Sequence, residues 1–210
     1  MKIKFLIGIL ALILGATSVC AQSNRSGRND RMRDRENTEM TEVTTTQPCM
    51  RYDDDEYYAA SGSLRIKMGG NVAPDAQQAV MATKLLGLLR QQVKQKIGGK
   101  YQAVVRDYFD QMDINETSSV ASHIESAGEQ VIDQYLNDTE EDCRQLGEMD
   151  EETGYANLYM GILVKKTALV DNLVDGIIAN DQVPQDAKAQ LRANEAAFRE
   201  SAFKQFEIQE

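Results

Sequence analysis

Histidine and tryptophan are the scarcest residues of this chain, whose 210 residues include one histidine and no tryptophan. A Ser-His-Asp or Cys-His catalytic arrangement would have to use His123, which is expected on the exposed side of an amphipathic helix. A zinc site needs several His or Cys ligands at short spacing, and His123, Cys49 and Cys143 are far apart in sequence. Without tryptophan, the usual platform for stacking against a sugar is missing too. These shortages argue against a nucleophilic triad and a zinc site.

Basic residues are in the minority, with 23 Lys and Arg against 33 Asp and Glu and a net charge of -10. This charge repels nucleic acid, so no nucleic-acid partner is expected. Phosphate-binding glycine fingerprints are absent, and Gly69-Gly70 is interpreted as a plain turn. The acidic run 53–56 lacks the alternating oxygens and the glycine of a calcium loop, which favours a solvated charge run. The sequence therefore predicts no catalytic, cofactor-binding or metal-ligating residue, and no cofactor.

A long apolar run occurs only near the start, where Phe5–Leu14 follows Lys2 and Lys4. This run is shorter than the roughly 20 residues of a membrane-spanning helix, and it ends in Val-Cys-Ala at 19–21. Residues 1–21 are therefore predicted to be a signal peptide that exports the chain to the periplasm or the outer membrane. Cleavage after Ala21 would discard Cys20, whereas lipidation of Cys20 would tether the chain to a membrane. Val19 favours cleavage, because Gly, Ala or Ser usually precedes a lipidated cysteine.

The rest of the chain divides by composition into a linker and a domain. Residues 22–48 have almost no apolar side chains and are predicted to be a disordered linker. Residues 49–210 are long enough for a single domain with one core. Cys49 and Cys143 remain after cleavage, and both a disulfide and two unpaired thiols are open possibilities.

Three segments have the patterns of strands, at Tyr57–Met68, Asp142–Met149 and Tyr155–Lys165. The last two are separated by an acidic, glycine-ended spacer at 150–154 that is typical of a hairpin loop. Apolar residues alternate along the third segment and predict its core face: Ala156, Leu158, Met160, Ile162 and Val164.

Helical spacing accounts for most of the remaining sequence. The first helix is predicted from Pro74, with a buried stripe of Ala76, Ala79, Val80, Leu86, Leu89, Val93 and Ile97. Gly98-Gly99 should weaken or kink it, although the pattern resumes at 101–112. Further helices are predicted at 119–136, capped by Ser118 or Ser119, and at 166–179. A single last helix at 184–207, interrupted by polar Asn194 and Glu195, is expected to pack by a narrow face and project at its end. The predicted fold class is α+β, with a three-stranded antiparallel sheet packed against several helices.

Several of these segments, taken in order, form a pattern that can be compared with a known family. The helix at 76–97 follows a Tyr-Tyr-Ala-Ala-Ser-Gly-Ser strand at 57–63, and later come a helix at 128–136, Tyr-Met-Gly-Ile at 159–162 and Ala-Ala-Phe-Arg-Glu at 196–200. This pattern resembles the twenty-kilodalton outer-membrane lipoprotein family of Gram-negative bacteria. The resemblance implies a small α+β domain in a cell-envelope protein of undefined molecular role, and it brings no catalytic residues with it.

We therefore expect a non-enzymatic, exported cell-envelope protein that binds an envelope protein partner, or itself as a homo-oligomer, through its helical surface. The alternative is an envelope hydrolase that uses a carboxylate pair. Two or more buried carboxylates in one pocket would favour the hydrolase, and a flat apolar patch would favour the binding protein. Membrane association is expected only if Cys20 is lipidated.

Overall fold

The computed structural model describes residues 47–68, 74–115 and 118–209. All of these described residues belong to one compact unit. The predicted signal peptide, nearly all of the predicted linker and Gly69-Gly70 lie outside the described residues.

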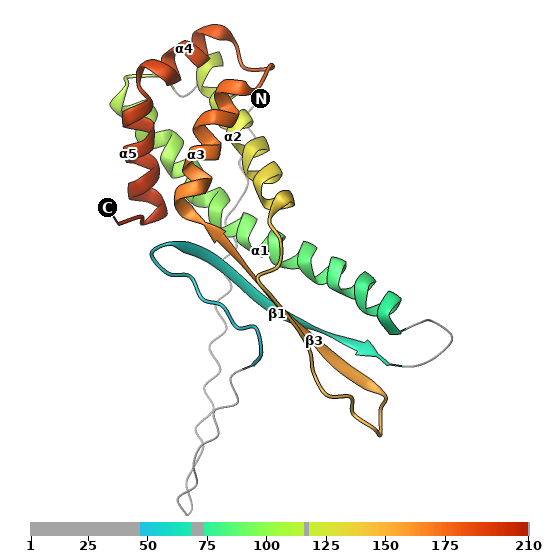
Figure 1. Ribbon diagram of the computed structural model, residues 1–210. Coiled ribbons are helices and arrows are strands. Elements are labelled where there is room, and N and C mark those ends of the chain that lie inside the picture. Colours follow the sequence, from blue (N-terminus) through green and yellow to red (C-terminus); the bar gives the residue numbers. More distant parts are fainter. Residues whose placement is uncertain (1–46, 69–73, 116–117, 210) are drawn as a thin grey trace, which may run out of the picture. The chain divides into compact units, whose positions relative to one another are not determined.

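The described residues form three strands and five helices (Figure 1). In chain order these are β1 (Tyr57–Lys67), α1 (Pro74–Gln111), α2 (Ser119–Asp138), β2 (Cys143–Leu146), β3 (Tyr155–Lys165), α3 (Lys166–Ala179), α4 (Gln185–Ala193) and α5 (Glu195–Phe206). The predicted α+β class is confirmed, as is the three-stranded antiparallel sheet.

The sheet has the strand order β1-β3-β2, so β3 is the central strand. β1 pairs with β3 over its whole length, from Tyr57 opposite Lys165 to Lys67 opposite Tyr155. β2 pairs with β3 over four residues only. The predicted second strand, Asp142–Met149, was therefore too long. After Gly147 the pairing shrinks to an isolated bridge at Asp150, whose side chain accepts the backbone N–H groups of the following turn.

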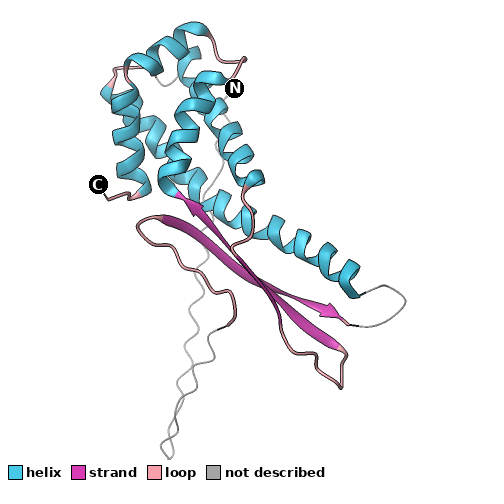
Figure 2. Ribbon diagram, viewed as in Figure 1, coloured by secondary structure: helices cyan, strands magenta, loops and turns pink. Residues whose placement is uncertain are grey.

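One face of the sheet is covered by the first half of α1. The predicted core face of β3 is confirmed, since its five alternating residues are all buried. A Cβ added to Gly62 of β1 would lie 3.3 Å from Leu89 and 3.4 Å from Leu85, which shows how closely α1 packs on this strand. Figure 2 shows α2 to α5 gathered around the second half of α1, at one end of the sheet.

The buried stripe of α1 differs from the predicted one in its first turns. Ala76, Ala79 and Val80 are exposed, and Leu86 is only partly buried. The buried residues are Ala82, Leu85, Leu89, Val93 and Ile97. Apolar residues occupy two adjacent registers at the start of this helix, so spacing alone does not select the register that faces the sheet.

α1 continues without interruption through Gly98 and Gly99, where the sequence suggested a weak point. Ile97, directly before this pair, and Tyr101, two residues after it, are completely buried. Packing on both sides therefore outweighs the cost of about 1 kcal/mol for each glycine in a helix.

α2 begins as predicted, because the Ser118 side chain accepts the N–H of Ala121 and caps the helix. It approaches α1 very closely at Gly128, where an added Cβ would lie well inside contact distance of the Tyr101 hydroxyl. That hydroxyl donates a hydrogen bond to the carbonyl of Ile124 at 2.8 Å. Gly128 is thus required for the seating of a buried tyrosine between two helices.

The predicted last helix is two helices, α4 and α5, which separate at Asn194. The Asn194 side chain donates to the carbonyl of Gln190, and its own carbonyl accepts from Phe198 at the start of α5. The expected projection of the C-terminal end is wrong, because Phe206 is completely buried and packs edge-on against Tyr58, with ring centroids 6.1 Å apart.

Candidate functional site

Cys49 and Cys143 form a disulfide with a Cα–Cα distance of 5.4 Å, which settles the question that the sequence left open. Cys143 is the first residue of β2 and lies opposite Gly161 of β3. Since β1 flanks the other side of β3, the bridge joins the segment before β1 to the far edge strand, across the central strand.

The bridged segment crosses the sheet face opposite α1 directly above Gly161. A Cβ on Gly161 would lie 2.6 Å from the carbonyl oxygen of Cys49 and 3.0 Å from Cγ of Arg51. The backbone N–H of Arg51 donates to Oγ of Ser61 at 2.6 Å, and its guanidinium pairs with Asp142 at 2.5 Å. The crossing is therefore held by a covalent bond, a hydrogen bond and an ion pair.

The acidic run that follows shapes the start of β1, although the sequence predicted only a solvated charge run. Asp54 accepts the backbone N–H groups of Glu56 and Tyr57, and Asp53 accepts that of Ala59 at 2.7 Å. Asp53 also pairs with Lys96 of α1 at 2.8 Å. No three His, Cys, Asp or Glu side chains of the described segments come together as metal ligands would.

Asp53 also lines a hollow of about 450 Å³, which lies where β1, α1, α3 and the end of α5 meet. We call it the Tyr58 hollow, and it is lined by Asp53, Asp54, Asp55, Tyr58, Lys96, Lys100, Lys166 and Glu207. Tyr58 and Lys166 are buried, at 2% and 3% exposure, whereas the four carboxylates are exposed. Burial raises the pKa of Tyr58, and the nearby Glu207 and Asp53 charges raise it further, so its phenol stays protonated.

The electrostatics of the carboxylates give the hydrolase alternative no support. No Asp or Glu is buried in the described part of the chain. Burial tends to raise the pKa of Asp53, but hydrogen bonds from Lys96 and Ala59 and the nearby lysine charges hold it below its ordinary value. Hydrogen bonds from Lys204 and Gln205 likewise lower the pKa of Asp107. A general acid in a glycosidase needs the opposite shift.

His123 is partly buried on α2 rather than fully exposed, and its Nδ1 lies 2.5 Å from the carbonyl oxygen of Ser119 one turn earlier. Among the described residues, no carboxylate bonds to its ring. The His123 ring is therefore held by a backbone carbonyl of its own helix.

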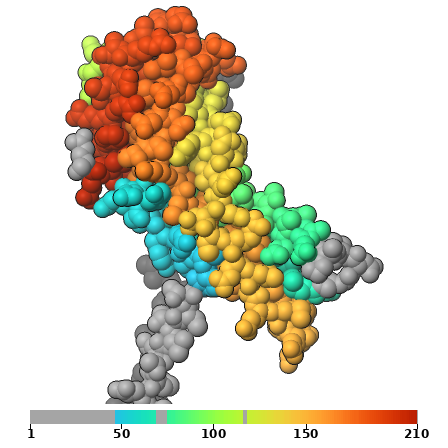
Figure 3. Space-filling model, in the orientation of Figure 1, coloured from blue at the N-terminus to red at the C-terminus, as the bar shows by residue number. Residues whose placement is uncertain are grey.

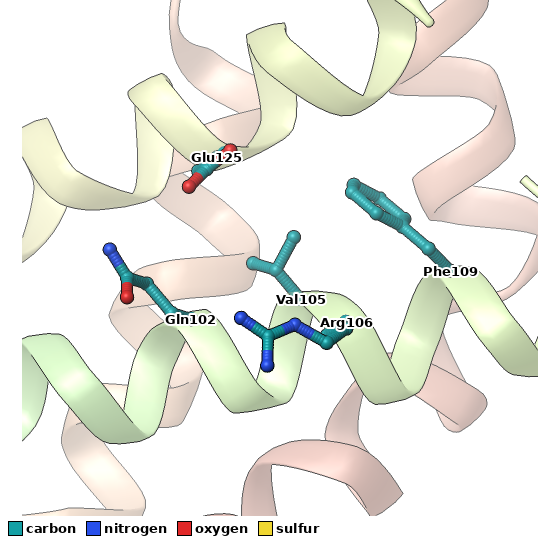
Figure 4. A pocket seen from close by; sticks show the side chains of 5 residues that line it. All are labelled: Gln102, Val105, Arg106, Phe109 and Glu125. Carbon is teal, nitrogen blue, oxygen red and sulfur yellow. The ribbon is translucent and has the colours of Figure 1, made fainter. Parts of the chain in front are cut away.

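A second hollow, of about 270 Å³, lies between α1 and α2 (Figure 4). Val105 and Phe109 of α1 are buried and form its floor, while Arg106 and Glu125 are exposed on its rim. Figure 4 shows that Glu125 comes from the facing helix and that the other labelled side chains come from α1. This second hollow has one acidic and one basic residue, so it lacks the pair of carboxylates that a hydrolase would need.

The exposed side of α1 has an unusual composition for so charged a chain. We call it the α1 face, and it consists of Val80, Lys84, Gly87, Leu88, Gln91 and Gln95, all exposed. Val80 is 68% exposed and Leu88 is 46% exposed. Figure 3 shows the first half of α1 (green) at the surface. Only one of the six residues is charged.

The sequence alone predicted neither the α1 face nor the Tyr58 hollow. Val80 was placed in the core stripe, and Lys166 was taken only as the first residue of a helix. The lysines of the Tyr58 hollow are about 70 residues apart between α1 and α3, so no local spacing could have brought them together.

No protein-family model, curated protein or solved structure matches this chain. Within residues 47–68, 74–115 and 118–209, none of the helices combines the length and apolar composition needed to cross a membrane.

Proposed function

We propose that this chain is a non-enzymatic, exported cell-envelope protein that binds proteins, itself included, through the α1 face. The observation that supports the proposal is the exposure of Val80 and Leu88 on one side of α1. They are eight residues apart, close to two helical turns, and therefore lie on the same side about 12 Å apart.

The low charge of the α1 face favours contact with another protein. Asp, Glu, Lys and Arg make up 27% of the whole chain and the net charge is -10, so most of the surface repels a second acidic molecule. The α1 face has one charge, on Lys84, among apolar and amide side chains. Burying such a surface costs little desolvation of charge and gains apolar contact.

Gly87 lies between Val80 and Leu88 and has no packing role inside the molecule. Apart from its chain neighbours and the backbone of its own helix, no atom comes within 4 Å of the place where its Cβ would be. Glycine in a helix interior costs about 1 kcal/mol relative to alanine, and it lets another backbone approach closely. An uncovered glycine beside two exposed apolar side chains is consistent with a partner helix that packs there.

The surroundings of the α1 face suit a protein better than a small molecule. The hollow that Gly87 lines with residues of α2 measures about 230 Å³, below the roughly 300–1,000 Å³ of typical ligand pockets. The α1 face therefore offers exposed side chains for contact with another protein and no hollow of ligand size beside Gly87.

The proposal is tested with Val80→Glu combined with Leu88→Glu. A matched control is Met149→Glu, at an apolar residue that is 51% exposed outside the helices. Sedimentation velocity measures self-association, and photo-crosslinking from position 91 in intact cells measures contact with other envelope proteins. We expect the double substitution to abolish the oligomer or the crosslinks and the control to retain them. Equal behaviour of the double variant and the unsubstituted protein would reject the α1 face.

Export is tested separately by the mass of the protein recovered from cell fractions. A chain that starts at Gln22 in the periplasmic fraction indicates cleavage after Ala21. A diacylglyceryl mass on Cys20 in the membrane fraction indicates lipidation, and an uncleaved cytoplasmic chain would contradict export altogether.

A further inference from the structure

We propose that the second hollow, between α1 and α2, is a binding site for a free α-amino acid with an apolar side chain. In this site the Arg106 guanidinium pairs with the carboxylate of the ligand, and the Glu125 carboxylate pairs with its ammonium group. The site is separate from the α1 face and does not depend on the function proposed for that face.

The second hollow lies close to the place where α1 and α2 make contact. Four of its lining residues follow the i, i+3, i+4, i+7 spacing of one side of α1: Gln102, Val105, Arg106 and Phe109. The fifth, Glu125, is on α2 three residues before Gly128, where that helix approaches Tyr101 of α1 very closely. The hollow therefore begins about one helical turn from this close approach.

The two charged side chains of the second hollow have no partner among the described residues. Arg106 and Glu125 form no ion pair with each other or with another described residue, and neither side chain takes part in a hydrogen bond there. Both are exposed, so water satisfies them in the free protein. A ligand can therefore bind both groups without first breaking an ion pair.

The hollow beside Gly87 differs in this respect, although it also lies between α1 and α2. Its lysine, Lys94, already pairs with Asp133, and its arginine, Arg90, donates two hydrogen bonds to the carbonyl of Thr139. A charged ligand would have to compete with these contacts. The second hollow, by contrast, presents a cation and an anion that are both unpaired within the described part of the chain.

The charges of the second hollow match a ligand that has one charge of each sign. Arg106 and Glu125 cancel, so a ligand with a single charge would be attracted by one of them and repelled by the other. Figure 4 shows Arg106 on the α1 side of the hollow and Glu125 on the α2 side. A free α-amino acid has an ammonium and a carboxylate group on one carbon, and both are charged at neutral pH. It can therefore bind to both helices at once.

The floor of the hollow favours an apolar side chain on the ligand. Val105 and Phe109 are buried, at 4% and 3% exposure, and a side chain on the α-carbon of the ligand would cover what remains exposed of them. The volume of about 270 Å³ lies just below the roughly 300–1,000 Å³ of typical ligand pockets, so the ligand has to be small. A phosphoethanolamine headgroup also has both charges, but it offers no apolar branch to this floor.

NMR of arginine side chains tests this proposal on the purified protein. L-leucine, N-acetyl-L-leucine, L-leucinamide and glycerophosphoethanolamine are each titrated at equal ionic strength, and the Nε–Hε signal of Arg106 is followed. We expect a saturable shift with L-leucine. N-acetyl-L-leucine lacks the ammonium group and L-leucinamide lacks the carboxylate, so each should bind about tenfold more weakly or worse, because a charge-assisted hydrogen bond is lost.

Two variants decide whether the two charged residues are responsible, with the amide signal of Phe109 as the readout. Arg106→Gln and Glu125→Gln should each weaken L-leucine binding about tenfold. Arg106→Gln should then bind L-leucine and L-leucinamide equally, and Glu125→Gln should bind L-leucine and N-acetyl-L-leucine equally. The matched controls are Arg192→Gln on α4 and Glu129→Gln on α2, at exposed residues that do not line the hollow, and both should retain full binding.

Four results would each overturn the proposal: no saturable shift with L-leucine, equal binding of L-leucine and either derivative by the unsubstituted protein, unchanged L-leucine binding by Arg106→Gln or Glu125→Gln, or tighter binding of glycerophosphoethanolamine than of L-leucine. Val80→Glu with Leu88→Glu should leave L-leucine binding unchanged, so that failure of either site is seen independently of the other.

Discussion

Gly161 lies where the chain crosses over its own sheet, and no other residue fits that position without a shift of the backbone. Its missing Cβ would be 2.6 Å from a backbone oxygen of Cys49, closer than side chains normally come. Gly161→Ala should therefore lower the free energy of unfolding by roughly 1–3 kcal/mol, as overpacking does. Urea unfolding measures the change.

Gly98→Ala is the control for this prediction. Gly98 is in the interior of α1, and nothing beyond its chain neighbours and its own helix backbone lies within 4 Å of the place where a Cβ would be. Alanine there should stabilise the protein by about 0.5–1 kcal/mol. A neutral Gly161→Ala would mean that the crossing segment can move aside.

The second prediction at the residue scale concerns Asp53 and the pH dependence of stability. Its pKa is lower in the folded protein than in the unfolded chain, so its ion pair stabilises the fold fully above the unfolded pKa. That contribution is lost as the pH falls below about 4. Asp53→Asn should cost at most about 1 kcal/mol at pH 7, because the pair with Lys96 is partly exposed, and should cost little at pH 3.

The comparison is Asp55→Asn, which removes the same charge from a carboxylate with no hydrogen bond or ion pair in the described part of the chain. Urea unfolding at the two pH values should show a pH-dependent loss for Asp53→Asn only. An equal loss for both variants would trace the effect to net charge.

At the scale of elements, the spacing of apolar residues does not always show which face of a helix is buried, and contact with other elements then selects that face. The alternation in β3 predicted its core face correctly, since a strand has two faces and the apolar residues occupied one. The start of α1 has apolar residues in two adjacent registers, and contact with Gly62 selects Leu85 and Leu89. Asn194 was recognised as a polar interruption but not as a helix boundary, because both helices around it bury apolar residues.

Leu89 tests the register of α1 against the sheet. It is completely buried beside Gly62, whereas its neighbour Leu88 is 46% exposed. Leu89→Ala should lower the free energy of unfolding by roughly 2–5 kcal/mol, and Leu88→Ala should change it by about 0.5 kcal/mol or less. Thermal and urea unfolding of the two variants measure this difference. Similar losses in both would place the helix in another register.

For the whole molecule, the sequence predicted the fold class and most element bounds, because both depend on local patterns. It could not predict the Tyr58 hollow, since this hollow depends on which distant segments meet. The Tyr58 hollow is lined by residues from four separate parts of the chain, and the packing of α5 brings Glu207 to Lys100. Whether Cys49 and Cys143 pair could not be predicted for the same reason.

The disulfide is the contact that most constrains the molecule as a whole. Cys49 and Cys143 are 94 residues apart, so the bond closes a loop that contains β1, α1 and α2. Loop-closure entropy predicts that replacing both cysteines with alanine lowers the free energy of unfolding by about 4–5 kcal/mol, a large share of a domain's usual stability. Intact mass after alkylation without reductant should show no alkyl group on either cysteine, and both after reduction. Urea unfolding of the reduced protein should match that of the double alanine variant. If the reduced protein unfolded at the same urea concentration as the oxidised one, the unfolded chain would have to hold this loop closed without the bond, and the entropic account would fail.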